Sequence, residues 1–351
     1  MKYFLAIIVV LTSLSCRKSP DKAAAAASEE QKNTAEAAFD FTLVFASCND
    51  QEREQPLWKP IIDHQPDLFV WGGDNIYADT EDMAKMKADY DKVAAHPDYK
   101  ALAEMTAITG TWDDHDLGEN DAGNEYPKIE ESKKLMLDFL NVPSDDERRS
   151  RDGVYTSQTF TADQGSIKLI LLDTRSFRDS LKKSKEPMRR YDAWPEGEGG
   201  TLLGAAQWQW LEEELNDDSA NFTLIVSSIQ FLNDSHGWEK WGNHTSEVKK
   251  MEQLLQGAAA RNILFLSGDR HMAEISVDTE AGLSYPLIDF TSSGLTHTWI
   301  DGATEGNVHR ISNVVKRLNF GVLGFDFEKN TVTFEIRGED DFLYERHIQQ
   351  Y

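Results

Sequence analysis

Short apolar segments alternate with amphipathic segments along most of the chain. Apolar runs rich in β-branched and aromatic residues predict buried strands. They lie at residues 41–47, 67–72, 154–160, 167–172, 222–228, 263–267, 287–291, 321–327 and 331–337. Apolar residues spaced three and four positions apart predict helices at residues 57–64, 80–95, 129–140 and 204–215. This alternation predicts one α/β domain over residues 39–351, in which helices cover sheets.

The first 38 residues follow a different pattern. Residues 1–15 hold one lysine, an apolar run and then small residues, which is typical of a secretory signal peptide and too short for a spanning helix. The ending Ser-Leu-Ser before Cys16 resembles a bacterial lipoprotein cleavage site, after which Cys16 would carry the lipid. An ordinary signal peptide with an incidental cysteine is the alternative. Residues 16–38 are polar and low in complexity, so we expect a flexible tether there.

The charge balance and the cysteines narrow the class of protein. The chain carries 36 basic and 61 acidic residues, so its formal net charge is −25. Such a surface repels nucleic-acid backbones and argues against a nucleic-acid-binding groove. The two cysteines are Cys16 and Cys48. If Cys16 is acylated, Cys48 has no disulfide partner, so it is either a small buried apolar residue or a metal ligand.

Polar side chains of the kind that bind ligands follow the predicted strands directly. They occur in Cys48-Asn49, Gly73-Asp74-Asn75-Ile76-Tyr77, Asp113-Asp114-His115-Asp116, Asp173-Thr174-Arg175 and Gly268-Asp269-Arg270-His271. In open α/β sheets, ligands bind beyond the carboxyl ends of the strands. Turn chemistry alone explains any one of these groups, because Gly and Asp are common at strand ends. Their repeated occurrence at the same kind of position indicates one shared site.

The residue types suit two neighbouring cations. Hard oxygen donors for calcium, magnesium or manganese are offered by Asp113, Asp114 and Asp116, whereas Cys48 and His271 suit iron or zinc. Asp74 is a candidate bridge between the ions, and Tyr77 would bind a trivalent iron as a phenolate. Paired cations neutralise a phosphate ester, lower the pKa of a bound water and align in-line attack. The pattern therefore favours phosphoester hydrolysis.

The same segments resemble the alkaline phosphatase D (PhoD-like) family of calcineurin-like metallophosphoesterases. The resemblance covers nearly all of residues 43–326. It rests on Ala46-Ser47-Cys48-Asn49, Gly73-Asp74-Asn75-Ile76-Tyr77-Ala78-Asp79, Thr111-Trp112-Asp113-Asp114-His115-Asp116, Leu172-Asp173-Thr174-Arg175-Ser176-Phe177-Arg178, residues 207–211, Ser228-Ile229-Gln230, Leu266-Ser267-Gly268-Asp269-Arg270-His271 and Thr291-Ser292-Ser293-Gly294. It implies a four-layer αββα sandwich with a single catalytic domain at residues 39–351. It also implies iron(III) with one or two Ca²⁺ ions, other divalent metals being the alternative.

The resemblance gives each candidate residue a role. Iron would be held by Cys48, Asp74, Tyr77 and His271. Calcium would be held by Asp74, Asp114 and Asp269, with Asp113 and Asn120. The placing of His271 on iron and Asp269 on calcium follows from the softness of the two donors, and the reverse assignment is the alternative. His115 would protonate the leaving group. Substrate would be bound by Arg175, whose guanidinium fits phosphate oxygens in pairs, and by Asn49, Arg178 and Gln230.

The chain departs from the family pattern at three places. Ala46 stands where many members have Gly, and Asp116 stands where many have Glu. Many members also carry a further β-domain ahead of the first motif, where this chain has only residues 16–38. We therefore expect a more open site and leave the substrate range undecided. Trp194, Trp238, Trp241 and Trp299 either line the cleft or pack in the core.

Together these features predict an exported, monomeric phosphatase or phosphodiesterase that scavenges phosphate through in-line attack of a metal-bound hydroxide. A lipid anchor would hold it to the membrane in the periplasm or at the cell surface. The alternatives are a phospholipase D-like phosphodiesterase and a non-catalytic lipoprotein that binds metal or another ligand. A glycosidase needs only two carboxylates and leaves Cys48, Tyr77 and His271 unexplained.

Overall fold

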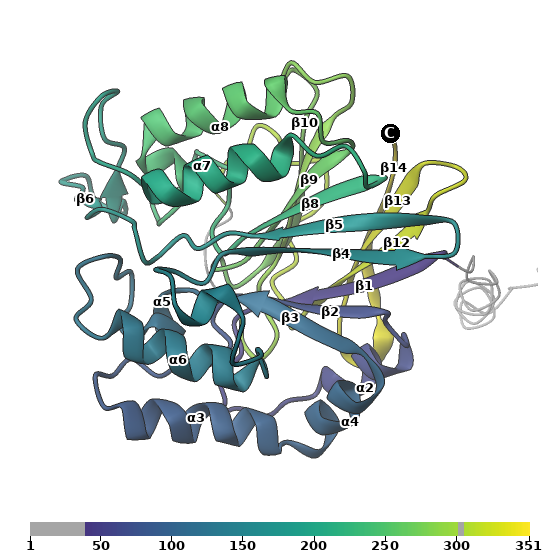
Figure 1. Ribbon diagram of the computed structural model, residues 1–351, viewed down its shortest axis with the longest axis horizontal. Coiled ribbons are helices and arrows are strands. Elements are labelled where there is room, and N and C mark those ends of the chain that lie inside the picture. Colours follow the sequence, from purple (N-terminus) through teal and green to yellow (C-terminus); the bar gives the residue numbers. More distant parts are fainter. Residues whose placement is uncertain (1–38, 301–304) are drawn as a thin grey trace, which may run out of the picture. The chain divides into compact units, whose positions relative to one another are not determined.

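Two six-stranded mixed sheets pack face to face in the computed structural model, which describes residues 39–300 and 305–351 (Figure 1). In order, the first sheet contains β14 (Leu343–Gln350), β13 (Thr331–Arg337), β12 (Phe320–Asp326), β1 (Phe41–Ala46), β2 (Leu68–Gly72) and β3 (Ala107–Thr111). The second contains β10 (Ala273–Asp278), β11 (Leu287–Ser292), β9 (Ile263–Ser267), β8 (Phe222–Ser227), β5 (Gly165–Leu171) and β4 (Thr156–Ala162). A short hairpin joins β6 (Lys182–Lys183) to β7 (Tyr191–Asp192).

Helices cover the outer face of each sheet (Figure 1). The first sheet is covered by α2 (Trp58–Asp63), α3 (Met83–Ala95), α4 (Pro97–Met105), α5 (Asp114–Leu117) and α6 (Ile129–Phe139). The second is covered by α7 (Gly204–Leu215) and α8 (Thr245–Gly257). Three short 3₁₀ turns are η1 (Glu147–Arg149), η2 (Trp241–Asn243) and η3 (Glu339–Asp341). The order of layers is αββα, which confirms the predicted sandwich.

Three apolar clusters separate the four layers. The middle cluster joins the two sheets, and the outer clusters join each sheet to its helices. Strand β1 shows how one sequence serves two clusters: Leu43 and Phe45 face the second sheet, whereas Val44 and Ala46 face the helices. Because both faces are buried, the strand reads as a continuous apolar run. Each fully buried side chain of this size stabilises the fold by about 1.5–3 kcal/mol.

Several boundaries and elements differ from the sequence prediction. The helix expected at residues 80–95 begins only at Met83, because the Asp82 side chain accepts the backbone N–H groups of Ala84 and Lys85. The α4 helix was not predicted, although Pro97 at its first turn is a common start signal. The mostly polar α8 and β14 were also missed. None of the helices in the described ranges is long and apolar enough to cross a membrane.

The carboxyl ends of the parallel strands from both sheets meet at one end of the domain. Strands β1, β2 and β3 are parallel, as are β5, β8, β9 and β11. At this end Thr111 donates its hydroxyl to Leu172 O (2.7 Å), and Leu295 N donates to Ser47 O (3.2 Å). These bonds join the turns of the first sheet to those of the second. The predicted ligand residues all follow strands that end here.

Candidate metal centre

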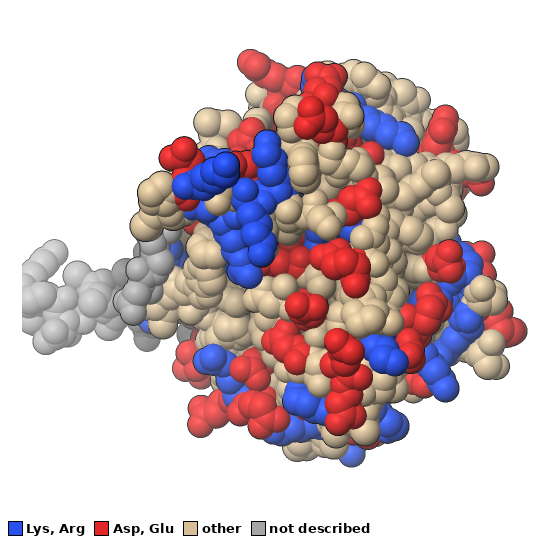
Figure 2. Space-filling model, turned by 90° about the vertical axis from the view of Figure 1, so that its left-hand side faces the viewer, with Lys and Arg blue, Asp and Glu red and all other residues tan. Residues whose placement is uncertain are grey.

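The turns beyond the strands hold four predicted ligands in an uncommon backbone conformation. Cys48 (φ 63°), Asp74 (φ 51°), Asp269 (φ 65°) and His271 (φ 51°) all lie in the left-handed region. For non-glycine residues this conformation costs roughly 1–3 kcal/mol each and persists only where the surroundings enforce it. Such strain concentrates at functional sites. Here it aims four side chains from two sheets into one region, on a face where acidic side chains gather (Figure 2).

One group of ligand atoms combines sulfur, oxygen and nitrogen. Cys48 Sγ lies 3.5 Å from Asp74 Oδ2, and the Tyr77 hydroxyl donates to the same carboxylate oxygen at 3.1 Å. The Tyr77 hydroxyl also lies 2.8 Å from His271 Nε2. Ligand atoms of Cys48, Asp74 and His271 all lie within 4.8 Å of one another. This mixture of donors suits a transition metal rather than calcium.

A second group contains only carboxylate oxygens. Asp113, Asp114 and Asp269 each place one oxygen within 4.8 Å of the others, and Asp74, Asp114 and His115 form an overlapping group. Asp74 therefore links the groups. It belongs to the sulfur-containing group and also to the group with Asp114, and Asp114 in turn belongs to the group that contains only carboxylates. Two adjoining cation positions with Asp74 between them account for this overlap. The all-oxygen position suits a hard cation such as Ca²⁺.

The electrostatics of these buried groups also favour bound cations. Burial, reinforced by the neighbouring carboxylate of Asp114, raises the pKa of Asp74 well above its usual range and that of Asp269 to about 7. Burial likewise raises the pKa of the Cys48 thiol, as do the charges of Asp74 and Asp269. Within the described residues, Asp113 Oδ2 is buried and has no hydrogen-bond partner. Cations would supply the missing positive charge, so the residues fit the metals that the sequence implies.

His115 lies beside the carboxylates with its ring fixed from two sides. Its Nδ1 lies 2.8 Å from the Asp79 carboxylate, and its ring centre lies 4.1 Å from that of Tyr77. Burial lowers the pKa of His115, but the carboxylates of Asp114, Asp74 and Asp79 outweigh it and raise that pKa to about 11. Because Asp79 occupies Nδ1, the second ring nitrogen, Nε2, is left for proton transfer.

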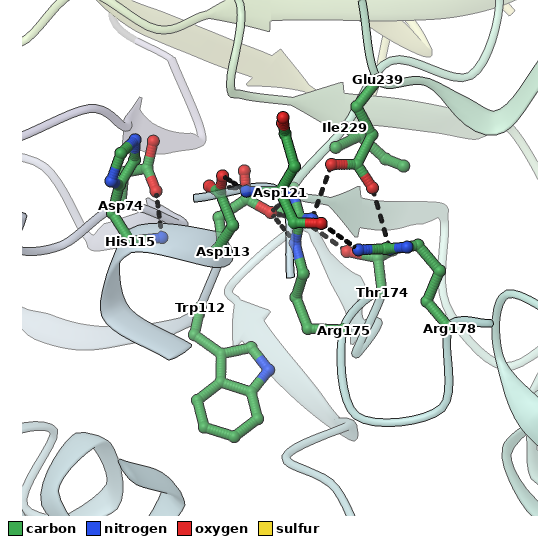
Figure 3. Close-up of polar contacts among 12 residues, drawn as sticks. Asp74, Trp112, Asp113, His115, Asp121, Thr174, Arg175, Arg178, Ile229 and Glu239 are labelled. Atoms are coloured by element: carbon green, nitrogen blue, oxygen red, sulfur yellow. Dashed lines mark hydrogen bonds and ion pairs between the residues drawn. The ribbon is translucent and has the colours of Figure 1, made fainter. Parts of the chain in front are cut away.

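Arg175 is buried behind the carboxylates (Figure 3). Its Nε donates to Asp113 Oδ1 (2.5 Å), and its Nη1 pairs with Glu239 Oε2 (2.7 Å). Glu239 Oε1 in turn pairs with Arg178 Nε at 2.9 Å, so the Asp113, Arg175, Glu239 and Arg178 side chains form one buried chain of charges. The predicted contact between Arg175 and phosphate stays a prediction, and in this structure the guanidinium holds Asp113 in place.

Three other predicted residues have the following surroundings. Arg178 is fully buried and bonded to Glu239 and to backbone carbonyls. Gln230 donates to Glu274 Oε1 (2.9 Å) and Thr291 Oγ1 (2.8 Å), and Asn120 is exposed. Substrate binding by Arg178 and Gln230 and metal binding by Asn120 stay predictions. Asn49 is buried and donates to Asn75 O (3.0 Å), and its predicted contact with substrate stays a prediction.

The structure adds three residues that the sequence patterns did not single out. Asp79 ends the segment Gly73-Asp74-Asn75-Ile76-Tyr77-Ala78-Asp79, whose sequence pattern does not predict its contact with His115. His297 lies just beyond β11, with its ring centre 4.3 Å from that of His271 and 4.9 Å from that of Tyr77. Its position after a strand is the signal that could have revealed it. Glu239 lies in a long irregular segment, so no periodic pattern marks it.

This two-sheet sandwich, with strained turns that carry candidate metal ligands at the carboxyl ends of its strands, is of the metallophosphoesterase-like class. The pattern of the PhoD-like phosphatase family matches residues 43–305, and the chain belongs to that family. Among curated proteins, alkaline phosphatase D of Bacillus subtilis (strain 168) is 22% identical in an alignment of 275 residues that covers 66% of this chain and 46% of that protein. The chain thus spans about half the length of this relative.

Solved structures show the same fold. The structure of PhoD is 18% identical and superposes with a TM-score of 0.67, covering 88% of this chain and 68% of the other. A dimetal phosphatase from Danio rerio is 13% identical with a TM-score of 0.51, covering 89% of this chain and 99% of the other. At these identities the matches establish the shared architecture. Support for two cation positions comes from the distances between the candidate ligand atoms of this chain.

Proposed function

We propose that the protein is a metal-dependent hydrolase of phosphate esters. The observation that carries the proposal is the meeting of Cys48, Asp74, Asp114, Asp269 and His271 at the seam between the two sheets. These residues come from four separate turns, and four of them occupy left-handed backbone positions. Membership in the PhoD-like phosphatase family supports the reaction class.

The donor sets allow each cation to be assigned. Cys48, Asp74, Tyr77 and His271 would hold iron(III), which favours anionic ligands. Asp114 and Asp269 would hold Ca²⁺ together with Asp74, with Asp113 Oδ2 directed to the same position. The bound cations would neutralise the phosphate and increase the acidity of a nearby water.

The remaining side chains position the reacting groups. His115 would donate a proton from Nε2 to the oxygen of the leaving group, while the Asp79 carboxylate keeps Nδ1 protonated and the ring in place. Arg175 would fix Asp113 through the bond from its Nε, and Glu239 would fix Arg175. The arrangement would give the acid and the ligands a defined geometry before substrate binds.

The biological setting is a separate part of the proposal. We place the protein outside the cytoplasm as a monomeric lipoprotein that releases phosphate for uptake, and this rests on the signal-like residues 1–15 and on Cys16. Replacing Cys16 by Ser should release the chain from the membrane fraction and abolish acyl labelling. Retention in the membrane fraction, combined with unlabelled wild-type protein, would contradict the anchor.

The function is tested by metal analysis of protein purified without chelators, followed by assays on phosphate monoesters and diesters. We expect about one iron per chain, bound calcium, and hydrolysis that stops when calcium is chelated. A chain that binds both metals and hydrolyses neither ester class would instead support the alternative of a non-catalytic lipoprotein that binds metal. A fully active, metal-free chain would contradict the proposal outright.

A further inference from the structure

The hairpin of β6 and β7 concentrates positive charge in an acidic protein. Residues 182–190 contain five of the 36 basic residues and one acid, Glu186, which gives 5 − 1 = +4 where the whole chain carries −25. Figure 2 looks onto the face that carries the strand ends. It shows Lys and Arg side chains gathered in one dense group there, whereas elsewhere on that face they are interspersed with acidic ones. The hairpin therefore makes a local positive field on this face.

The tip of the hairpin combines free cations with an apolar side chain. Lys183, Lys185 and Arg189 are exposed, and none of them forms an ion pair with another residue of the described ranges. Met188 between them is 94% exposed and is held in a left-handed turn (φ 66°). A single exposed apolar side chain needs no explanation, but one set among unpaired cations is the pattern of an interfacial surface.

Hydrogen bonds fix the hairpin to the edge of the metal centre. The backbone N–H groups of Arg190 and Tyr191 both donate to Gly237 O, at 2.8 and 2.9 Å. The Arg190 guanidinium and the Tyr191 hydroxyl each lie 2.6 Å from Asp121 Oδ2. Asp121 N in turn donates to Asp114 Oδ2 at 2.5 Å. One residue, Asp121, thus separates the hairpin from a candidate metal ligand.

A pair of tryptophans continues the same edge on the other side of Gly237. Trp238 packs edge-on against Trp299, with ring centres 4.7 Å apart. Trp299 N donates to His271 O (3.2 Å), and the ring centres of these two residues are 5.7 Å apart. Trp299 is 44% exposed and Ile300 is 72% exposed. Basic, apolar and indole side chains therefore border the metal centre together.

We propose that this edge, formed by Lys183, Lys185, Met188, Arg189 and Trp299, docks on a membrane surface rich in anionic lipids and turns the metal centre toward it. Each cation near an anionic leaflet strengthens binding about fivefold. Methionine and tryptophan suit the boundary between headgroups and acyl chains. A soluble polyanion would use the cations but would leave both apolar groups in water. Repulsion from more distant acids is screened beyond about 8 Å at physiological salt.

The first experiment measures partitioning onto vesicles of phosphatidylcholine alone or with 30% phosphatidylglycerol, a composition chosen to be about one-third anionic. It uses the full chain with Cys16→Ser, so that no acyl group contributes. Lys183→Glu, Lys185→Glu and Arg189→Glu together should lower partitioning onto anionic vesicles by about 100-fold or more. The matched control makes the same charge change at Lys100, Lys134 and Lys250, which are exposed on helices. It should lower partitioning less than about threefold, because these lysines lie outside the docking edge.

The second experiment follows the hairpin tip itself. In the same background, Met188→Cys carries an environment-sensitive fluorophore, because Cys48 is buried. Anionic vesicles should shift its emission to the blue. A label at Phe342→Cys, also exposed (61%) but next to Glu339, Asp340 and Asp341, should not respond.

Two outcomes would overturn the docking proposal. Equal losses in the two triple variants would show that net charge, not the hairpin, controls binding. The second outcome combines two results: the fluorophore at residue 188 does not respond to vesicles, and the hairpin variant changes only the KM for a soluble polyanionic diester. Together they would show that the hairpin binds a soluble polymer and not a membrane. Hydrolysis of a soluble nitrophenyl ester by both triple variants reports on the metal centre separately, so failure of docking and failure of the hydrolase function are distinguishable.

Discussion

At the scale of single residues, Cys48 is the most informative side chain. It is a free, fully buried thiol held in a left-handed turn beside Asp74. Burial alone would leave it protonated, whereas a bound metal drives a thiol to lose its proton. We expect a visible absorption band from a Tyr77 phenolate on iron(III). Cys48→Ser should lose this band and most activity, and Tyr77→Phe should shift or abolish the band while keeping the thiol.

Absorption spectra and iron content measured on the same samples test this prediction. Calcium chelation serves as the control, because it should stop turnover without removing the band. A colourless, iron-free and fully active wild type whose Cys48 reacts freely with thiol reagents would leave Cys48 as a packing residue only.

The contact between Asp79 and His115 leads to a second prediction for single residues. General acid catalysis is typically worth about 10²–10⁴-fold, and it matters most for poor leaving groups. His115→Ala should therefore slow alkyl phosphates far more than nitrophenyl phosphate. Asp79→Asn should show the same selectivity with a smaller loss, about tenfold, because the ring stays but is less firmly oriented. Equal losses on both substrates would make His115 a metal ligand or a structural residue.

Sequence position explains why the candidate metal ligands lie together, but it does not show which partners the candidate substrate residues contact. Ligands such as Asp74 and Asp269 follow strands directly, and the ends of parallel strands meet. Arg178 and Gln230 follow strands too, but they are paired with Glu239 and Glu274, which lie far away in the chain. A sequence pattern shows where a side chain starts but not which distant partner neutralises it.

At the scale of elements, the turn after β2 brings the two sheets into contact. Gly73 has a φ of 100°, and a Cβ added there would lie 2.7 Å from the Asp113 Cβ and 3.1 Å from the Ser228 Cβ. Gly73→Ala should destabilise the fold by about 2 kcal/mol or more and displace Asp113, with a parallel loss of calcium affinity. Denaturant unfolding and calcium titration measure the two effects.

Gly257→Ala is the matched control for this substitution. A Cβ at Gly257, the last residue of α8, would meet nothing within 4 Å. We expect a stability change of less than about 1 kcal/mol and unchanged calcium affinity. If both variants behave alike, contact between the sheets at Gly73 does not control the site.

The elements differ in how clearly the sequence marks them. Strands such as β1 and β9 are buried on both faces and appear as apolar runs. Strand β14 lies at the edge of its sheet and is largely polar, so its pairing with β13 decides its conformation. Helix α8 does carry a short apolar stripe, because Val248, Met251 and Leu255 lie three and four positions apart and pack against the core. Tertiary contacts form β14, whereas the local pattern of α8 is a signal that the sequence prediction did not use.

At the scale of the whole molecule, buried like charges should make stability depend on metal. A ligand at 100 times its Kd stabilises the native state by about 2.7 kcal/mol, which raises Tm by roughly 4 °C in a domain of this size. We expect a shift of this order when calcium is added to metal-depleted protein. Asp269→Asn should raise the Tm of the depleted protein, because it removes a buried charge, and should reduce the calcium-dependent shift. Scanning calorimetry measures both, and an unchanged calcium shift in the variant would contradict the ligand role of Asp269.

The division of the metal centre between two sheets also sets the order in which the molecule can mature. Cys48, Asp74 and Asp114 are synthesised early, but Asp269 and His271 follow at least 155 residues later (269 − 114 = 155). The early residues alone would offer only part of each donor set. The complete set exists only once the second sheet has packed on the first, so we expect the metal to be selected late, from the ions that surround the chain when folding finishes.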